Sequence, residues 1–253
     1  LPNGRRIFNV AIRTIQLHKG QAIYGVGGGI TWDSTWESEY REVHQKAAVL
    51  YRKQARFKLI TTGKISQKSL LFEDQHLERL TKASRYFAFP FEQEVLKQKI
   101  EKECQACDFH QDYRLRITLS KSGEMELSRQ ILTPLSPTFC QAKLCLQEAD
   151  LQTPFTYFKT THRPHLSLGK QEIIYHNAAG ELLETSIGNL VLKIAGKLYT
   201  PPIRLGILAG IYRQHLLETG QVEEKVLTVP DLDQAETIYG CNAVRGLYEL
   251  EVI

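Results

Sequence analysis

Residues 157–163 read Tyr157-Phe158-Lys159-Thr160-Thr161-His162-Arg163, and residues 180–190 read Gly180-Glu181-Leu182-Leu183-Glu184-Thr185-Ser186-Ile187-Gly188-Asn189-Leu190. A lysine behind an aromatic pair is a weak signal by itself, because most lysines are solvated surface charges. Together with an acid it becomes more specific, since pyridoxal phosphate chemistry requires both groups. The lysine holds the aldehyde as an imine and moves protons, and the acid keeps the pyridine nitrogen protonated. The two stretches therefore point to a pyridoxal phosphate site.

The hydrophobic patterns around these stretches predict a mixed α/β fold. Downstream, we expect a helix near 210–219 and strands near 172–176, 182–185, 190–194, 197–200, 237–241 and 246–252. Upstream, we expect a strand at 57–62, helices at 73–88 and 92–106, and strands at 114–120 and 126–132. Because Thr153-Pro154 is typical of a linker, the sequence predicts two subdomains, residues 56–152 and residues 153–253.

The first 52 residues have a pattern of their own. Residues 7–15 and 22–30 are rich in β-branched and apolar residues on either side of His18-Lys19-Gly20, which predicts a hairpin. Apolar residues at helical spacing then predict a helix from about 36 to 54. A hairpin and one helix bury too little surface to form a self-sufficient domain.

Composition excludes several classes of protein. A net charge of +4 over 253 residues is mild and the cations lie among acids, so nucleic acid is not an expected partner. Apolar stretches such as 203–211 end well before the roughly 18 residues of a membrane span. The five cysteines, Cys104-x-x-Cys107 among them, favour reduced thiols over a metal site. The N-terminus lacks an initiator Met and a signal peptide, so we interpret it as the cut edge of a longer, cytoplasmic protein.

From Phe57 to the C-terminus the chain resembles class IV aminotransferase-fold proteins, and among them the 4-amino-4-deoxychorismate lyases. The resemblance is carried by six motifs in family order, at residues 73–80, 158–163, 183–190, 199–202, 206–213 and 241–246. It implies a two-subdomain fold that binds pyridoxal 5'-phosphate, and proteins of this fold are usually homodimers.

The resemblance also assigns roles to residues. It implies that Lys159 is the Schiff-base lysine, that Glu184 pairs with the pyridine nitrogen and that Asn189 supports the turn of this acid. Further residues that it implies at the cofactor are Arg79 and the Gly210-Ile211-Tyr212 and Asn242-Ala243 amides, which would bind the phosphate, and Thr62. Arg114, Arg116 and Arg245 are candidates to bind substrate carboxylates, and each of them can alternatively be a surface charge.

Two positions depart from the family pattern. A tyrosine usually lies three residues beyond the arginine of the lysine motif, where this chain has Leu166, and the segment 164–171 is short. Ala243 replaces a serine whose hydroxyl can bind the phosphate. We therefore expect reduced cofactor affinity or activity, and a non-catalytic remnant is one alternative.

In the order and spacing of residues 10–14, 25–30 and 33–34, followed by Glu39-x-x-Glu42-x-x-x-Lys46, the first 52 residues resemble the C-terminal end of chorismate-binding enzymes of the aminodeoxychorismate synthase kind. The resemblance implies that Arg13, Lys46 and the Gly27 backbone are a vestigial chorismate site. It also implies that Glu42, with Glu39 close by, would ligate Mg²⁺ in an intact domain. Glu39, Glu42 and Lys46 share one helix face, which alternatively is only a solvated charged face. The rest of that domain is not in this sequence, so we expect no chorismate amination.

The order of the two parts resembles that of natural synthase/lyase fusions. The implied reaction converts 4-amino-4-deoxychorismate to 4-aminobenzoate and pyruvate in folate precursor synthesis. A glutamine amidotransferase is the expected partner of a full-length parent. The alternative within pyridoxal enzymes is a transaminase that acts on a D- or branched-chain amino acid, because it needs the same lysine and acid.

Overall fold

The structure is a computed structural model that describes residues 14–51, 55–148, 153–167 and 169–253. The chain divides into two compact units, residues 1–55 and residues 56–253. No helix in the described ranges has the length and apolar character needed to cross a membrane.

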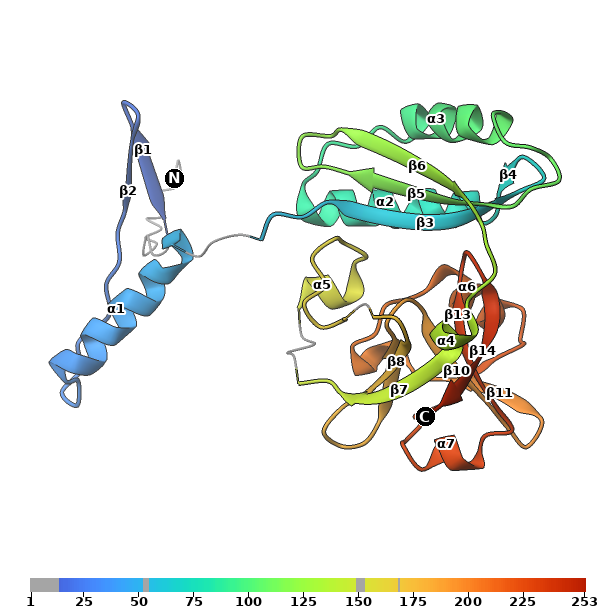
Figure 1. Ribbon diagram of the computed structural model, residues 1–253. Coiled ribbons are helices and arrows are strands. Elements are labelled where there is room, and N and C mark those ends of the chain that lie inside the picture. The colour runs from blue at the N-terminus through green and yellow to red at the C-terminus, as the bar shows by residue number, and fades with distance from the viewer. Residues whose placement is uncertain (1–13, 52–54, 149–152, 168) are drawn as a thin grey trace, which may run out of the picture. The chain divides into compact units, whose positions relative to one another are not determined.

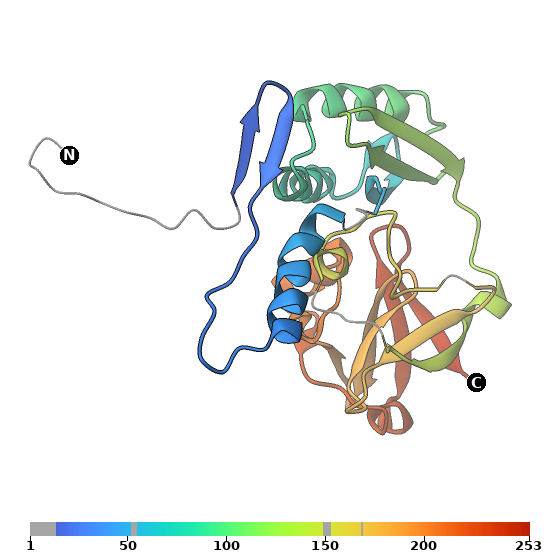
Figure 2. The same ribbon diagram turned by 90° about the vertical axis from the view of Figure 1, so that its left-hand side faces the viewer.

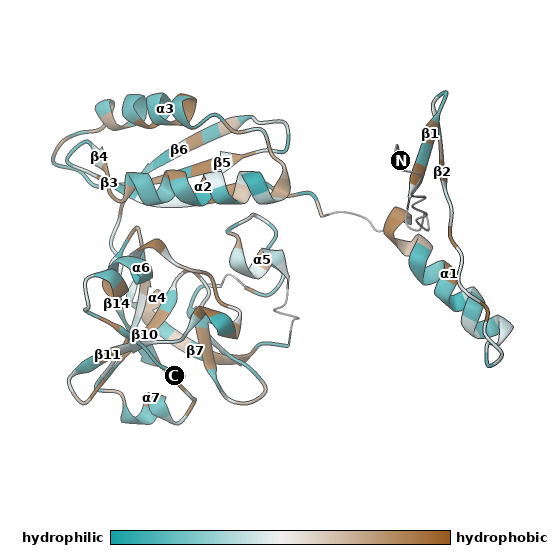
Figure 3. Cartoon of the chain, turned by 180° about the vertical axis from the view of Figure 1, so that it is seen from behind, coloured by the Kyte–Doolittle hydropathy of each residue, from teal (hydrophilic) through white to brown (hydrophobic). Residues whose placement is uncertain are grey.

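The first unit contains a hairpin and a helix. Strands β1 (Ile15–His18) and β2 (Gln21–Tyr24) pair antiparallel, and Lys19 and Gly20 turn the chain at φ values of 48° and 80°. The hairpin is shorter than expected after Tyr24, and most of its expected first strand lies outside the described residues. Helix α1 (Trp36–Tyr51) has no buried residue. It is largely hydrophilic, with hydrophobic residues near its C-terminal end (Figure 3).

The second unit begins with a four-stranded antiparallel sheet that two helices cover on one face (Figure 1). The sheet order is β4-β3-β5-β6. Its elements are β3 (Leu59–Ser66), β4 (Ser69–Leu70), α2 (Glu73–Phe87), α3 (Gln93–Gln105), β5 (Tyr113–Leu119) and β6 (Met125–Ile131).

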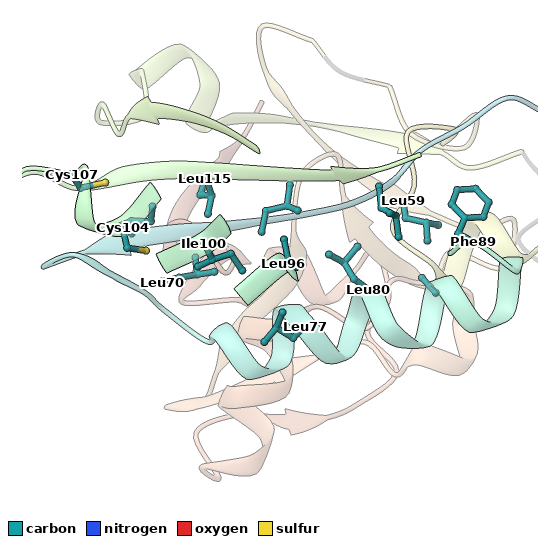
Figure 4. Close-up of a cluster of buried hydrophobic side chains, with 14 residues drawn as sticks. Leu59, Leu70, Leu77, Leu80, Phe89, Leu96, Ile100, Cys104, Cys107 and Leu115 are labelled. Carbon is teal, nitrogen blue, oxygen red and sulfur yellow. The ribbon is translucent and has the colours of Figure 1, made fainter. Parts of the chain in front are cut away.

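Leucine and isoleucine side chains hold this subdomain together between sheet and helices (Figure 4). Leu77 and Leu80 of α2 and Leu96 of α3 meet Leu115 of β5, and each is at most 1% exposed. Because side chains alternate along a strand, residues two apart share a face. The residues between the core positions of β3 and β5 therefore lie on the opposite face of the sheet, and this face lines the cavity described below.

An extended segment, 132–136, leads from β6 to the second subdomain (Figures 1 and 2). There an eight-stranded sheet has the order β12-β11-β10-β13-β14-β7-β8-β9, and an additional pairing between β9 and β10 closes it on itself. Its strands are β7 (Gln141–Leu146), β8 (Glu172–His176), β9 (Leu182–Thr185), β10 (Asn189–Ile194), β11 (Lys197–Thr200), β12 (Glu223–Glu224), β13 (Thr237–Asn242) and β14 (Gly246–Val252). Its helices are α4 (Pro137–Cys140), α5 (Pro154–Tyr157), the 3₁₀ turn η1 (Ile203–Leu205), α6 (Ile211–Glu218) and α7 (Asp231–Gln234).

Strand β7 lies ahead of the expected subdomain boundary between residues 152 and 153. It pairs parallel with β14 and with β8, so its backbone hydrogen bonds belong to the eight-stranded sheet. The expected linker at Thr153-Pro154 is the start of α5, where proline occupies the first helical turn and its missing N–H costs nothing.

Candidate active site

A cavity of about 560 Å³ opens between the four-stranded sheet and the eight-stranded sheet. Among the residues predicted from sequence, those that line it are Lys159, Glu184, Arg79, Asn189, Gly210, Ile211, Asn242, Ala243, Thr62, Arg114, Arg116 and Arg245. Tyr212 is not in the lining, and its ring packs on Phe72 and His215. Distant parts of the sequence therefore meet at one site.

Backbone pairing with the first subdomain fixes Lys159. The Lys159 carbonyl accepts a hydrogen bond from the Ile60 N–H (3.0 Å), and the Thr161 N–H donates to the Lys58 carbonyl (2.9 Å). Leu59 and Thr160 form an isolated antiparallel bridge. The lysine segment thus extends the sheet at β3 and directs Lys159 into the cavity from a rigid backbone.

Aromatic rings brace the same segment. Phe155 and Phe158, which both precede the lysine, stack or pack edge-on against Phe57, Phe87 and Tyr86, with ring centroids 4.6–5.9 Å apart. Such offset and edge-to-face contacts add to the area that the rings bury. They join α5 and its C-cap residue Phe158 to the C-terminal end of α2, so the two subdomains meet beside Lys159.

Burial and neighbouring cations tune the charges of the lysine and the acid. Burial, and then the positive charges of Arg163 and Arg79, hold the pKa of Lys159 well below its usual value, although Glu184 opposes this. Burial raises the pKa of Glu184 to about 7, and the positive charges of Arg163 and Lys159 partly oppose that rise. A lowered pKa enlarges the fraction of Lys159 that is a neutral amine, which is the form that attacks an aldehyde.

A tight turn presents Glu184 and Asn189 side by side. The two residues pair across the β9–β10 junction, and Thr185 and Gly188 close the turn through an N–H to carbonyl bond of 2.9 Å. Gly188 lies so close to β13 that an added Cβ would be 2.5 Å from the Cys241 carbonyl oxygen. This close contact explains the glycine.

The carboxylate of Glu184 has one atom without a partner. Its Oε1 is buried and accepts no hydrogen bond within the described residues. A buried acceptor left alone is costly, so the site suits a ligand that donates a hydrogen bond there. A protonated pyridine nitrogen is such a donor, and the residues present therefore fit pyridoxal phosphate.

The N-terminal end of α6 and Arg79 form an anion-binding corner. Arg79 reaches across from α2 and donates from Nη2 to the Ala209 carbonyl (2.7 Å), one residue before the N-cap Gly210. A Cβ at Gly210 would overlap Asn189 Oδ1, while Asn189 Nδ2 donates to the Leu208 carbonyl (2.8 Å). First-turn amides of a helix attract phosphate, and a guanidinium adds charge.

The turn after β13 is organised by Asn242. Its Oδ1 accepts the N–H groups of Val244 (2.9 Å) and Arg245 (3.0 Å). The Val244 and Arg245 amides are therefore already hydrogen-bonded. The groups of this turn that remain to bind a phosphate are those of Asn242 and Ala243. Ala243 leaves this corner without the serine hydroxyl that the family pattern has there.

Three further arginines, Arg114, Arg116 and Arg245, line the same cavity. Arg114 and Arg116 project from the same face of β5, and Arg245 follows the Asn242 turn. Burial and then the positive charge of Arg114 lower the pKa of Arg245. Within the described ranges none of the three forms an ion pair with a carboxylate, and Arg114 donates only to the neutral Gln130 (2.7 Å). The three therefore remain available to an anionic ligand.

Sequence reasoning missed two charged groups at the site. Arg163 lines the cavity with its Nη2 4.0 Å from Glu184 Oε2. Glu172 is fully buried beneath the turn and accepts hydrogen bonds from the Ser186 and Tyr248 hydroxyls. Arg163 lies in the quoted lysine motif, but only the fold reveals its closeness to Glu184. Nothing in the local pattern of Glu172 distinguishes it from a surface acid.

Leu166, which replaces the tyrosine of the family pattern, is packed against the second subdomain. Leu166 lines the cavity and packs in a cluster with Tyr175, Leu183 and Ile207. The Ser167 N–H donates to the Tyr175 hydroxyl (2.8 Å). The short segment is therefore held by contacts with β8, up to Ser167.

The first unit brings together most of its vestigial chorismate residues. Lys46 Nζ donates to the Gly27 carbonyl (2.8 Å) and pairs with Glu42 (2.5 Å). Glu39 Oε1 accepts from the Ser34 hydroxyl (2.6 Å), and Arg13 lies outside the described residues. In the part of the chain that the structure describes, no three His, Cys, Asp or Glu side chains gather to hold a metal ion. Mg²⁺ binding by Glu42 and Glu39 stays a prediction for an intact domain.

Known proteins that are similar in sequence include two kinds of enzyme. A probable branched-chain-amino-acid aminotransferase of Thermotoga maritima is 27% identical over 68% of this chain and 68% of its own length. An aminodeoxychorismate lyase of Saccharomyces cerevisiae is 29% identical over 36% of this chain and 32% of its own length. The chain thus spans about a third of that lyase.

Solved structures share the fold. A putative amino-acid aminotransferase from Mesorhizobium loti has a TM-score of 0.69 and 26% identity, covering 78% of this chain and all of its own. A putative 4-amino-4-deoxychorismate lyase from Legionella pneumophila has a TM-score of 0.61 and 22% identity, covering 77% of this chain and 82% of its own. A hypothetical aminotransferase from Mycobacterium tuberculosis in its pyridoxal-phosphate-bound form has a TM-score of 0.64 and 16% identity, covering 77% of this chain and 80% of its own.

Family models match nearly the whole sequence. The model for chorismate binding enzymes matches residues 1–52, and the model for amino-transferase class IV matches residues 58–253. The mixed α/β fold expected from sequence is confirmed, as is the chorismate-binding fragment at the N-terminus. The chain belongs to the class IV aminotransferases, a family of pyridoxal-phosphate-dependent fold.

Proposed function

We propose that this chain is a pyridoxal-phosphate-dependent lyase that converts 4-amino-4-deoxychorismate to 4-aminobenzoate and pyruvate. The observation that carries the proposal is the charge of the cavity: its lining holds five arginines and Lys159 but one carboxylate, Glu184. The chorismate-binding segment in the same chain and the similarity to a named lyase point to the same substrate.

The distribution of the cations supports a substrate with two carboxylates. Arg79 lies at the phosphate corner and Arg163 beside Glu184, which leaves Arg114, Arg116 and Arg245 for the substrate. Guanidinium groups pair well with carboxylates, often through two parallel hydrogen bonds. 4-Amino-4-deoxychorismate carries one carboxylate on its ring and one on its enolpyruvyl group, whereas a branched-chain amino acid carries a single carboxylate.

The residues that would hold the cofactor are those assembled at the site. Lys159 would bind its aldehyde carbon, Glu184 its pyridine nitrogen, and Arg79 with the Gly210-Ile211-Tyr212 amides its phosphate. Asn189, Asn242, Ala243 and Thr62 would complete the contacts. When bound, pyridoxal phosphate supplies an electron sink at the carbon that bears the substrate amine.

Lys159 performs the proton transfers in this proposal. Its lowered pKa favours the neutral form of Nζ, which is able to take the proton from the amine-bearing ring carbon. The resulting ammonium then returns a proton to the departing pyruvate, and the ring becomes aromatic. The arginines orient the two carboxylates while the buried walls of the cavity limit access of water.

One observation favours a second candidate function. The similarity to the Thermotoga aminotransferase extends over 191 residues, whereas the similarity to the yeast lyase extends over 118 residues. A transaminase for a D- or branched-chain amino acid would use the same Lys159 and Glu184. The proposed homodimer, the amidotransferase partner of a longer parent and the cytoplasmic location apply to the lyase proposal and rest on the sequence.

The test is to incubate the protein and pyridoxal phosphate with 4-amino-4-deoxychorismate and to measure both products. The lyase proposal requires equimolar 4-aminobenzoate and pyruvate, and neither product with Lys159→Ala.

Arg114→Gln should raise KM for this substrate about tenfold, because a charge-assisted bond worth roughly 1.5 kcal/mol or more is lost, and should leave cofactor affinity unchanged. Conversion of the cofactor absorbance to the pyridoxamine form by a branched-chain or D-amino acid, without 4-aminobenzoate from the chorismate substrate, would instead establish the transaminase. Absence of any cofactor absorbance would overturn both.

A further inference from the structure

Arg163 acts electrostatically on both Lys159 and Glu184, the two groups that the proposed chemistry needs. Its Nη2 lies 4.0 Å from Glu184 Oε2, and the Arg163 and Glu184 side chains are 17% and 5% exposed. Both residues line the cavity together with Lys159. A charge in this position acts through protein rather than through bulk water, so its influence is strong.

The backbone around Arg163 is fixed at several points. The bridge between Leu59 and Thr160 anchors the segment on β3, and the Thr160 hydroxyl donates to the His162 carbonyl (2.8 Å). The Arg163 carbonyl in turn accepts the Leu166 N–H (3.1 Å). The guanidinium is therefore held near Glu184 by structured backbone rather than by a freely moving loop.

The charged and titratable groups around this trio come from several elements. Glu184 on β9 faces Arg163 and Lys159. Lys159 faces Arg163, Arg79 of α2, Glu184 and Arg116 of β5. Arg163 faces Glu184 and Tyr175 of β8, and His165 on its own segment faces both Arg163 and His162. Arg163 is the one arginine in these sets that acts on both the acid and the lysine.

We propose that Arg163 is a positioning residue that sets the charges of its two neighbours, holding Glu184 as a carboxylate and Lys159 as a neutral amine. The two effects have one electrostatic cause, because a fixed cation favours a nearby anion and disfavours a nearby second cation. Arg163 thereby prepares the acid to accept the pyridine N–H and the amine to bind the aldehyde. The inference rests on the cofactor roles of the proposed function but not on the choice between lyase and transaminase.

The first experiment reads Glu184 directly in the cofactor-free protein. Infrared difference spectra, with Glu184→Gln as the blank, follow the carboxylic acid C=O stretch as pH changes. We expect the wild-type midpoint near the Glu184 pKa of about 7. In Arg163→Gln it should rise by about one pH unit or more, because an adjacent opposite charge commonly lowers a carboxyl pKa by roughly one to three units. Arg163→Lys keeps the charge and should show a smaller rise.

A matched control is Arg114→Gln, which removes one positive charge from the same cavity at a site that does not face Glu184. Its Glu184 midpoint should equal that of the wild type. An Arg163→Gln midpoint that also equals the wild type would overturn the proposal. If Arg163→Gln does not fold, Arg163→Lys provides the test: it removes the guanidinium Nη2 that lies 4.0 Å from Glu184 Oε2, so its midpoint must still rise measurably, and an unchanged midpoint would overturn the proposal.

The second experiment measures pyridoxal phosphate affinity by absorbance titration at pH 7.5. Arg163→Gln should weaken binding several-fold to about tenfold, the factor that one pKa unit allows. If Arg163 acts through Glu184, Arg163→Gln should weaken binding much less when it is introduced into the Glu184→Gln variant than when it is introduced into the wild type. If Arg163→Gln weakens pyridoxal phosphate binding by the same factor when Glu184→Gln is also present, Arg163 does not act through Glu184. Because neither experiment uses substrate, a failed lyase assay leaves both results interpretable.

Discussion

The two units of this protein contain similar charged groups in different surroundings. In the first unit, Lys46 and Glu42 form an ion pair of 2.5 Å with side chains 29% and 49% exposed. In the second unit, Arg163 and Glu184 are 4.0 Å apart with side chains 17% and 5% exposed. The closer pair is solvated and contributes little, whereas the more distant pair lies in a cavity where burial shifts the pKa of Glu184 to about 7. Burial of the charged groups, rather than the distance between them, therefore distinguishes the cavity of the second unit, which can support chemistry, from the ion pair of the first unit.

The same contrast holds for packing. Unit two has clusters of fully buried leucines and isoleucines, but unit one leaves Leu17 and Ile30 about four-fifths exposed and Trp32 fully exposed. A segment matched by a family model can thus retain its local hairpin and helix although none of its described residues in 14–51 is buried. Function requires the core, because only packed walls exclude water from the charged groups.

The largest effect should come from Lys159→Ala. The variant loses the amine that holds the cofactor aldehyde and moves protons, so turnover should fall by about 10²–10⁴-fold or more. The cofactor absorbance of the lysine-bound form should vanish, although the phosphate corner at Arg79 can still bind the cofactor weakly. Absorbance spectroscopy and product formation check this, and a variant that keeps normal turnover would show that the cavity is not the active site.

A second test compares a buried leucine of the second unit with an exposed leucine of the first unit. Leu80→Ala leaves a cavity between α2 and the sheet and should lower the free energy of unfolding by about 2–5 kcal/mol. Leu80 is 1% exposed, whereas Leu17 on β1 is 80% exposed. Leu17→Ala should therefore change stability by about 0.5 kcal/mol or less. Denaturant unfolding followed by circular dichroism measures both, and equal losses would mean that Leu17 is covered in solution.

The raised pKa of Glu184 predicts a pH-dependent stability of the cofactor-free protein. Because the folded protein binds this proton up to about pH 7 while an unfolded glutamate releases it near its model value of 4.5, the stabilisation is present below pH 4.5. It is lost as pH rises from 4.5 to 7, by up to about 3 kcal/mol at 1.36 kcal/mol per pKa unit.

Measuring this effect requires a difference between two proteins, because other groups act in the opposite direction. Burial lowers the pKa of His76 to about 3, so its contribution is lost as pH falls. The stability of the wild type minus that of Glu184→Gln should isolate the Glu184 contribution between pH 4.5 and 7. A difference that stays constant across this window would contradict a raised Glu184 pKa.

Much of the fold follows from sequence where patterns are strong. The strands at 172–176, 182–185 and 197–200 agree with β8, β9 and β11, because apolar residues and turn residues mark them clearly. Strand β7 escaped prediction, since it is short, Ala142 is its one buried residue, and its last two residues are both exposed. Only its two parallel neighbours, far away in sequence, make it a strand.

The residues of the site that belong to sequence motifs could be predicted from the sequence. Lys159 and Glu184 follow from the chemistry of residue types, and Arg79 and Asn189 follow from resemblance. The role of Arg163 requires its distance to Glu184, and that of Glu172 requires the closure of the sheet that brings Ser186 and Tyr248 to it. Such contacts depend on long-range packing, which a local pattern does not contain.

The smallest effect should come from Lys46→Ala, the counterpart of the first variant in the other unit. Lys46 contacts Glu42 and the Gly27 carbonyl, and every residue that lines the cavity belongs to residues 60–245. Loss of an exposed i,i+4 ion pair costs about 0.3–0.5 kcal/mol, so turnover should stay within about twofold of the wild type. A parallel assay of Lys46→Ala and Lys159→Ala under one set of conditions checks this. A large loss of turnover in Lys46→Ala would contradict the contrast between the two regions, because it would mean that the chorismate-binding segment takes part in the reaction.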